Sequence, residues 1–163
     1  MSGTRSLGAS QTGGGLVALT LLLWSGIAHG QTVQVPRLSV DGARNVLHAA
    51  EQKAQQLRAP SSLAVVDPAG ELILFEQMQD ARPIGIELAI GKARSAALFQ
   101  EPTQALEAAI NSGRPAAITA ARIQMQGGVP IRISGAVVGA VGVSGFDKAN
   151  DVAIAEAAAA VVK

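Results

Sequence analysis

The sequence contains no cysteine and no tyrosine, and its single tryptophan, Trp24, lies near the amino terminus. The lack of cysteine excludes disulfides, thiolate metal sites and a thiol nucleophile. Beyond residue 30 the aromatic side chains are Phe75, Phe99 and Phe146, so recognition of bases or sugars by stacking is not expected. Alanine and glycine dominate instead. Because small side chains bury little area at roughly 25 cal/mol/Å², burial between identical subunits is an expected supplement.

An excess of either charge is also lacking. The chain has 13 Lys and Arg against 12 Asp and Glu, and Arg5 is the one charged side chain among the first thirty residues. Without those residues the formal charge is balanced. Nucleic acid is therefore excluded as a partner, because phosphate binding needs a net basic face.

The amino terminus has the pattern of a secretory signal. Arg5 precedes an apolar run from Leu16 to Ile27, and Ala28-His29-Gly30 places small residues where a signal peptidase cleaves. The run is too short for a membrane span, which needs roughly 20 apolar residues. We predict a cleaved signal at residues 1–30, one domain at residues 31–163, a periplasmic or secreted location and no membrane contact after cleavage; an uncleaved anchor is the alternative.

The periodicity of the remaining chain predicts helices and hairpins in alternation. Strand patterns occur in adjacent pairs rather than singly between helices, which favours an α+β fold over a doubly wound parallel sheet. We expect an antiparallel sheet of about five strands flanked by helices. The expected helices are 40–57, 84–98, 104–110 and 151–162, and the expected hairpins are 62–78 and 125–144.

The second hairpin is the most informative stretch. Its second arm has small residues at Ala136, Gly139, Ala140 and Gly142, where a strand normally carries bulk. Such positions let another backbone or a flat ligand approach closely. We expect this arm to form the floor of a ligand site, and Ser134-Gly135 to form the tight turn before it.

Motifs for common catalytic sites are missing, including G-x-S-x-G, H-E-x-x-H and a Walker loop. His48 could supply one axial bond to a haem iron, although a histidine on a helix flank is more often surface. Asp80 and Glu87 could hold a metal ion, or simply interact favourably with the dipole at the start of a helix. In an enzyme, these three side chains would be the acid–base candidates.

The remaining candidate ligand-binding residues are three cationic side chains and one threonine. Lys92, Arg94 and Arg132 could pair with propionates or other carboxylates, although such a side chain is more often a solvated surface charge. Thr103 is most simply the cap of the helix that follows it.

Several segments together resemble the GlcG/HbpS-like family of haem-binding or haem-degrading domains. They are Ser62 to Asp67 with Gly70, Ile90 to Phe99 leading into Pro102-Thr103, and Gly127 to Pro130 with Gly139 to Gly145. The resemblance implies a profilin-like domain that forms homo-oligomers and binds haem. It also implies that Thr103 lies at the haem, and Gly127 and Gly128 of the matching segment are further candidate haem-binding residues.

Taken together, we expect an exported, homo-oligomeric haem-binding protein connected with haem or iron handling or with redox sensing. One alternative is an enzyme that acts on a small organic acid or a tautomerising substrate. The other is a non-catalytic accessory of an exported dehydrogenase system.

Overall fold

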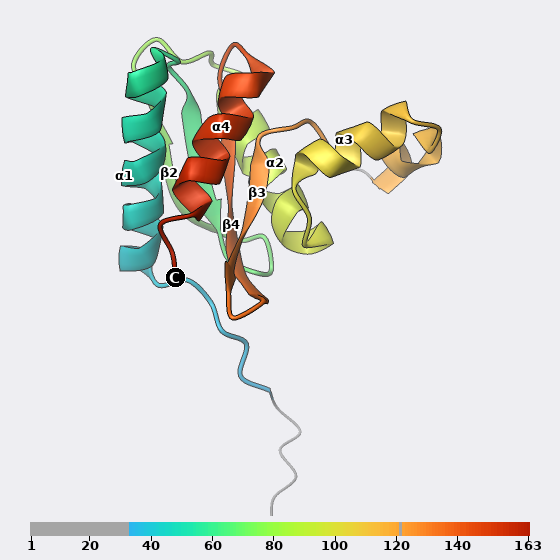
Figure 1. Ribbon diagram of the computed structural model, residues 1–163, viewed down its shortest axis with the longest axis horizontal. Coiled ribbons are helices and arrows are strands. Elements are labelled where there is room, and N and C mark those ends of the chain that lie inside the picture. Colours follow the sequence, from blue (N-terminus) through green and yellow to red (C-terminus); the bar gives the residue numbers. More distant parts are fainter. Residues whose placement is uncertain (1–32, 121) are drawn as a thin grey trace, which may run out of the picture. The chain divides into compact units, whose positions relative to one another are not determined.

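The computed structural model describes residues 33–120 and 122–163. The predicted signal, residues 1–30, lies outside the described residues. Residues Gln34–Lys163 form one unit, and its order of elements confirms the α+β prediction (Figure 1). The elements are α1 (Val40–Leu57), β1 (Ser62–Val66), β2 (Leu72–Gln77), α2 (Gly85–Phe99), α3 (Thr103–Asn111), the 3₁₀ helix η1 (Pro115–Ala120), β3 (Gly128–Ile133), β4 (Ala136–Ser144) and α4 (Lys148–Ala159).

The sheet has four antiparallel strands in the order β2-β1-β4-β3, where about five were expected. The two hairpins join through β1 and β4, which pair from Ser62 opposite Ser144 to Val66 opposite Ala140. Between α3 and β3, Pro115–Ala120 forms a 3₁₀ helix and adds no strand to the sheet. Its backbone therefore bonds locally rather than to a strand.

Helix α1 has the predicted bounds because both of its ends are marked by local chemistry. The Ser39 hydroxyl accepts a hydrogen bond from the amide of Gly42 at 3.1 Å, which caps the start. Arg58 adopts a left-handed conformation, φ 52°, which ends the helix. The buried face consists of Ala43, Val46, Leu47, Ala50 and Ala54.

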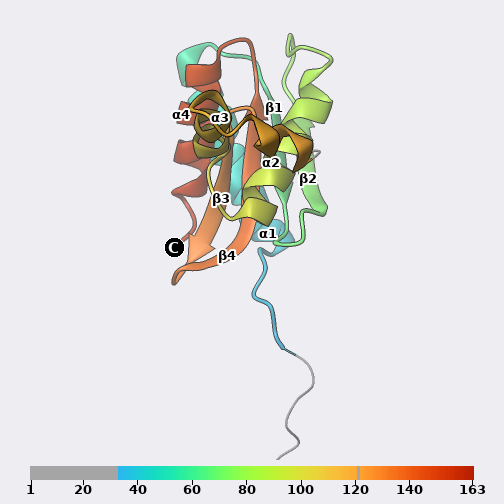
Figure 2. The ribbon, with the colours of Figure 1, turned by 90° about the vertical axis from the view of Figure 1, so that its right-hand side faces the viewer.

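Two apolar layers cover the sheet, one on each face (Figures 1 and 2). Alternate residues of a strand point to opposite faces; accordingly, Leu63 and Val65 pack with α1 and α4, while Ala64 and Val66 pack with α2. Both faces of the first hairpin are thus covered.

The expectation that β4 forms an open floor for a flat ligand is wrong, because α2 rests on it. A Cβ at Gly142 would contact the carbonyl oxygen of Ala89 and lie 2.5 Å from the amide nitrogen of Ala93. A Cβ at Gly139 would lie 2.6 Å from the carbonyl oxygen of Val66. The small residues serve the other predicted purpose, the close approach of a second backbone.

The turn between β3 and β4 is the expected one. Ser134 and Gly135 both have positive φ, 49° and 84°, as a two-residue hairpin turn of type I′ requires. The turn places the end of β3 beside the start of β4, so that Ile133 pairs with Ala136.

Helix α3 and η1 extend to one side of the sheet, away from α1 (Figures 1 and 2). The chain returns from them through Ile123, whose side chain packs against Gly91 of α2 so closely that a Cβ there would collide with it. The space beside Gly91 is therefore filled by this returning segment. Among the described helices, none is both long and apolar enough to cross a membrane.

Candidate functional site

Four of the predicted haem residues meet in one place, where α2, α3 and the start of β3 converge. Lys92 is 2% exposed and Thr103 is fully buried, and Gly127 and Gly128 lie against them. The ammonium of Lys92 donates to the carbonyl oxygen of Val143 and to Oδ2 of Asp151, both at 2.8 Å. We call this arrangement the Lys92 junction.

Asp151 of α4 completes the junction, and sequence reasoning missed it. Its Oδ1 accepts a hydrogen bond from the amide of Gly145 at 2.7 Å, so both carboxylate oxygens are bonded. Burial raises the pKa of Asp151, and the nearby ammonium of Lys92 opposes that rise. Asp151 lies 59 positions from Lys92 in the chain, so no local pattern could have linked them.

Thr103 is the first residue of α3, whose N-cap is Pro102, and its side chain makes no cap hydrogen bond. The prediction that it caps the helix is therefore wrong. Its hydroxyl oxygen instead accepts a hydrogen bond from the amide of Gly128 at 2.8 Å. A Cβ at Gly128 would contact the carbonyl oxygen of Lys92 and lie 2.8 Å from Cγ2 of Thr103. Gly128 is thus enclosed by the backbone of α2 and by the side chain of Thr103.

The other predicted cations lie elsewhere. Arg94 is half-buried and donates through Nε to the carbonyl oxygen of Gly70 at 3.0 Å. Arg132 is exposed and donates to the carbonyl oxygens of Gly135, at 2.9 Å, and Gln100, at 2.6 Å. Both side chains hold turns together, and neither contributes a hydrogen bond to the Lys92 junction.

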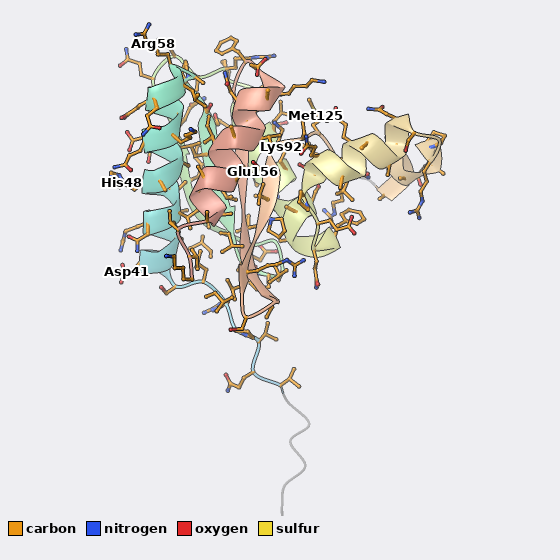
Figure 3. All side chains as sticks on the ribbon, viewed as in Figure 1. Asp41, His48, Arg58, Lys92, Met125 and Glu156 are labelled. Carbon is orange, nitrogen blue, oxygen red and sulfur yellow. The ribbon has the colours of Figure 1, made fainter. Side chains whose placement is uncertain are left out.

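His48 lies on the exposed face of α1, away from the junction (Figure 3). Its Nε2 is 2.9 Å from Nε2 of Gln52, and its Nδ1 is 3.9 Å from a carboxylate oxygen of Glu51. Helix α1 and α2 cover opposite faces of the sheet. The structure therefore does not bring His48 together with the candidates on α2.

Asp80 and Glu87 are both exposed, Asp80 in the turn after β2 with φ 65° and Glu87 in the first turn of α2. Among residues 33–120 and 122–163, no three His, Asp or Glu side chains come together as a metal-binding group. A cation bound by Asp80 and Glu87 would therefore have no third histidine or carboxylate ligand from the described residues.

A small cavity of 180 Å³ opens beside the junction, and we call it the Lys92 cavity. Its walls combine charged groups from α2, α3 and α4 with a few apolar side chains. The lining residues are Arg82, Leu88, Lys92, Glu107, Met125, Gln126, Ser144, Gly145, Phe146, Lys148 and Asp151.

A second hollow, of 280 Å³, adjoins it on the side of α3 and is mostly apolar; we call it the Met125 groove. Met125 is 51% exposed and lies near Lys92, between α4 and α3 (Figure 3). The groove is lined by Leu88, Glu107, Ile110, Ile118, Arg122, Ile123, Gln124 and Met125. Sequence reasoning assigned Met125 only to the start of a hairpin, and nothing in its neighbours signalled a groove.

One carboxylate fixes the segment that carries Met125. The amide of Gln126 donates to Oε2 of Glu107 at 2.8 Å, and its side-chain nitrogen donates to Oε1 at 3.1 Å. Burial alone would raise the pKa of Glu107, but these two hydrogen bonds, together with the nearby charges of Lys148 and Lys92, lower it overall. Helix α3 is thereby tied to the residues just before β3.

Residues 38–160 match the family model described as "Haem degrading protein HbpS-like". The chain belongs to the HbpS-like family. It is 40% identical over 108 residues to Protein GlcG of Escherichia coli strain K12, covering 66% of this chain and 81% of that protein. It is also 30% identical over 132 residues to the corrinoid adenosyltransferase PduO of Citrobacter freundii, covering 77% of this chain and 39% of that protein.

Solved structures agree with the family assignment. The crystal structure of HbpS superposes with a TM-score of 0.76 at 28% identity, covering 82% of this chain and 96% of HbpS. A crystal structure of a PduOC:haem complex superposes with a TM-score of 0.71 at 27% identity, covering 78% of this chain and 96% of that one. The predicted family and its antiparallel, helix-flanked fold are thus confirmed.

Proposed function

We propose that this member of the HbpS-like family is an exported haem-binding protein that acts as a homo-oligomer in haem or iron handling or in redox sensing. The observation that carries the proposal is the Met125 groove, an apolar surface with an exposed sulfur donor. Its support from outside the chain is the haem complex of a structural relative, PduOC, at 27% identity.

Thr103 and Lys92, two of the residues first predicted to hold the haem, are buried and already bonded within the chain. Thr103 is fully buried and its hydroxyl is bonded to Gly128. The Lys92 ammonium is engaged with Asp151. In the proposal, both side chains shape the wall beside the ligand rather than touch the iron or a propionate.

The Met125 groove fits a porphyrin better. Haem is a redox cofactor whose chemistry is its own, and the protein supplies binding and orientation. The thioether of Met125 is an established type of axial ligand, and Arg122 at the rim can pair with a propionate carboxylate. Leu88, Ile110 and Ile123 supply apolar contact and exclude water from the ring.

The size of the groove supports a role for a second copy. Its 280 Å³ is at the lower limit of ligand sites, about 300–1,000 Å³. A porphyrin bound there leaves part of its face outside the groove. We propose that another subunit covers that face, which also buries the exposed Ile118.

Titration of the purified chain with hemin tests the proposal. The expected result is a saturable Soret band at one haem per subunit, which weakens about tenfold in affinity in Met125→Leu through loss of roughly 1.4 kcal/mol. Met78→Leu is the matched control, because Met78 packs against the core at the end of β2. A flat titration, or equal weakening in both variants, would reject this site.

Export is tested separately. When the full gene product is expressed with its first thirty residues, we expect mature protein outside the cytoplasm beginning near Gln31, as read by intact mass. Deletion of residues 16–27 should keep it inside the cell. If the protein without the deletion stays in the cytoplasm at its full length, the export proposal is rejected.

A further inference from the structure

The Lys92 cavity has more positive groups than its own acids can satisfy. Both oxygens of Asp151 are already bonded, to Lys92 and to the amide of Gly145. Both oxygens of Glu107 accept from Gln126. The two carboxylates of the lining therefore have internal partners.

The cations of the lining are less fully bonded. An ammonium carries three donors, and Lys92 uses two of them within the described residues, on Val143 and Asp151. Arg82 and Lys148 form no ion pair with a carboxylate of the part of the chain that the structure describes. The guanidinium of Arg82 lies over the ring of Phe146, 5.5 Å from its centroid.

Counting the lining residues, three cations face two acids, which leaves a formal charge of plus one for an occupant to balance. The remaining walls are apolar and come from Leu88, Met125 and Phe146. A volume of 180 Å³ is below the range of drug-sized sites, about 300–1,000 Å³. A porphyrin cannot enter this cavity, but a molecule of a few heavy atoms can.

We propose that the Lys92 cavity binds a small aliphatic monocarboxylate. Its carboxylate meets the third N–H of Lys92 at the base and the side chains of Arg82 and Lys148 at the rim, as charge-assisted hydrogen bonds require. Its short apolar tail lies on Leu88 and Phe146. The site adjoins the proposed haem groove, with which it shares Leu88, Glu107 and Met125, and the proposal does not depend on haem being bound.

Butyrate is the probe, and its neutral isostere butyramide is the matched ligand control. We expect saturable shifts of the Gly145 and Gln126 amide resonances of the full chain with butyrate, and none with butyramide. Removing two rim cations in Arg82→Gln/Lys148→Gln should weaken butyrate binding by about tenfold or more, since both side chains are charge-assisted partners of the carboxylate in the proposal. Lys92→Met removes the cation at the base of the cavity, and the folded variant should also bind butyrate more weakly.

The matched protein control is Arg44→Gln/Lys53→Gln, which removes one arginine and one lysine from α1. It should leave butyrate binding unchanged, and the rim variant should still bind hemin. Equal binding of butyrate and butyramide, equal weakening in both double variants, or tighter binding of inorganic phosphate than of butyrate would overturn the proposal. Failure of hemin binding alone would leave it standing.

Discussion

Lys92 of α2 and Asp151 of α4 form a 2.8 Å ion pair between helices that cover opposite faces of the sheet. The pair passes beside Gly127, where a Cβ would lie 3.1 Å from Nζ of Lys92 and 2.9 Å from Cβ of Asp151. Gly127 also has φ +113°, which a residue with a side chain rarely adopts. One glycine therefore provides both the space and the backbone turn that the ion pair needs.

Loss of Lys92 should be costly because it leaves a buried carboxylate without its cation. The two side chains are 3% and 6% exposed, and breaking such a pair costs about 3–5 kcal/mol. We expect Lys92→Met to lower the free energy of unfolding in urea by that amount. The double variant Lys92→Met/Asp151→Leu should recover most of the loss, since it removes both buried charges.

The control is the exposed pair Arg44 and Asp41, whose side chains are 65% and 88% exposed. Exposed pairs contribute roughly 0.2–1 kcal/mol, so Arg44→Met should change the urea midpoint little. If Lys92→Met costs no more than Arg44→Met, the junction does not stabilise the fold.

A methyl group at Gly128 should separate α2 from β3. The added Cβ would contact the backbone carbonyl of Lys92 and lie 2.8 Å from Cγ2 of Thr103, and backbone cannot move aside as a flexible side chain can. Overpacking of this kind typically costs up to about 3 kcal/mol. Gly135→Ala is the comparison, because its Cβ would meet nothing within 4 Å. Gly135→Ala should lower stability only through its positive φ, by about 1–2 kcal/mol. Thermal unfolding should therefore show a larger loss of stability for Gly128→Ala than for Gly135→Ala.

Replacing Thr103 by its near-isostere valine tests the hydrogen bond that holds β3 to α3. The buried amide of Gly128 would lose its 2.8 Å acceptor, at about 1–3 kcal/mol. Thr103→Ser keeps the acceptor and should retain protection of the Gly128 amide in hydrogen exchange, whereas Thr103→Val should lose it. Equal protection in both variants would show that the hydroxyl does not hold this amide. A change in the Soret spectrum of the serine variant alone would instead place Thr103 at the haem.

Local signals made much of the fold predictable. The Ser39 cap and the apolar stripe of α1 gave its bounds at Val40 and Leu57, which the structure confirms. The Ser134-Gly135 turn was likewise predictable, because its two positive φ angles favour few residues. These features depend on residues within a few positions of one another.

The site was less predictable because it depends on contacts between distant segments. Thr103 looks like a cap from its neighbours, yet its hydroxyl bonds Gly128, 25 positions away. Gly142 looks like a ligand floor until α2 is placed on it. Met125 has no local pattern that marks it as exposed, since its groove is formed by α2, α3 and the segment after η1.

The pH dependence of stability should report the hydrogen bonds between Gln126 and Glu107. The pKa of Glu107 is lower in the folded chain than its ordinary value of 4.5; burial works against this shift, while the two hydrogen bonds from Gln126 and the charges of Lys148 and Lys92 together produce it. A group with a lowered folded pKa stabilises the protein above its unfolded pKa, and that contribution disappears as the pH falls through the folded value. Wild type should therefore exceed Glu107→Gln in stability at neutral pH, and the difference should shrink below pH 4.5.

Urea midpoints of both proteins between about pH 3 and pH 7 measure this difference directly. Glu101→Gln is the control, because Glu101 is exposed and its side chain makes no hydrogen bond within the described residues. The acid sensitivity of the whole protein cancels in each comparison, since every other carboxylate is shared. A Glu107→Gln difference that stays constant or grows in acid would mean that the ionised carboxylate does not hold the segment before β3, and that Met125 is positioned by its apolar contacts alone.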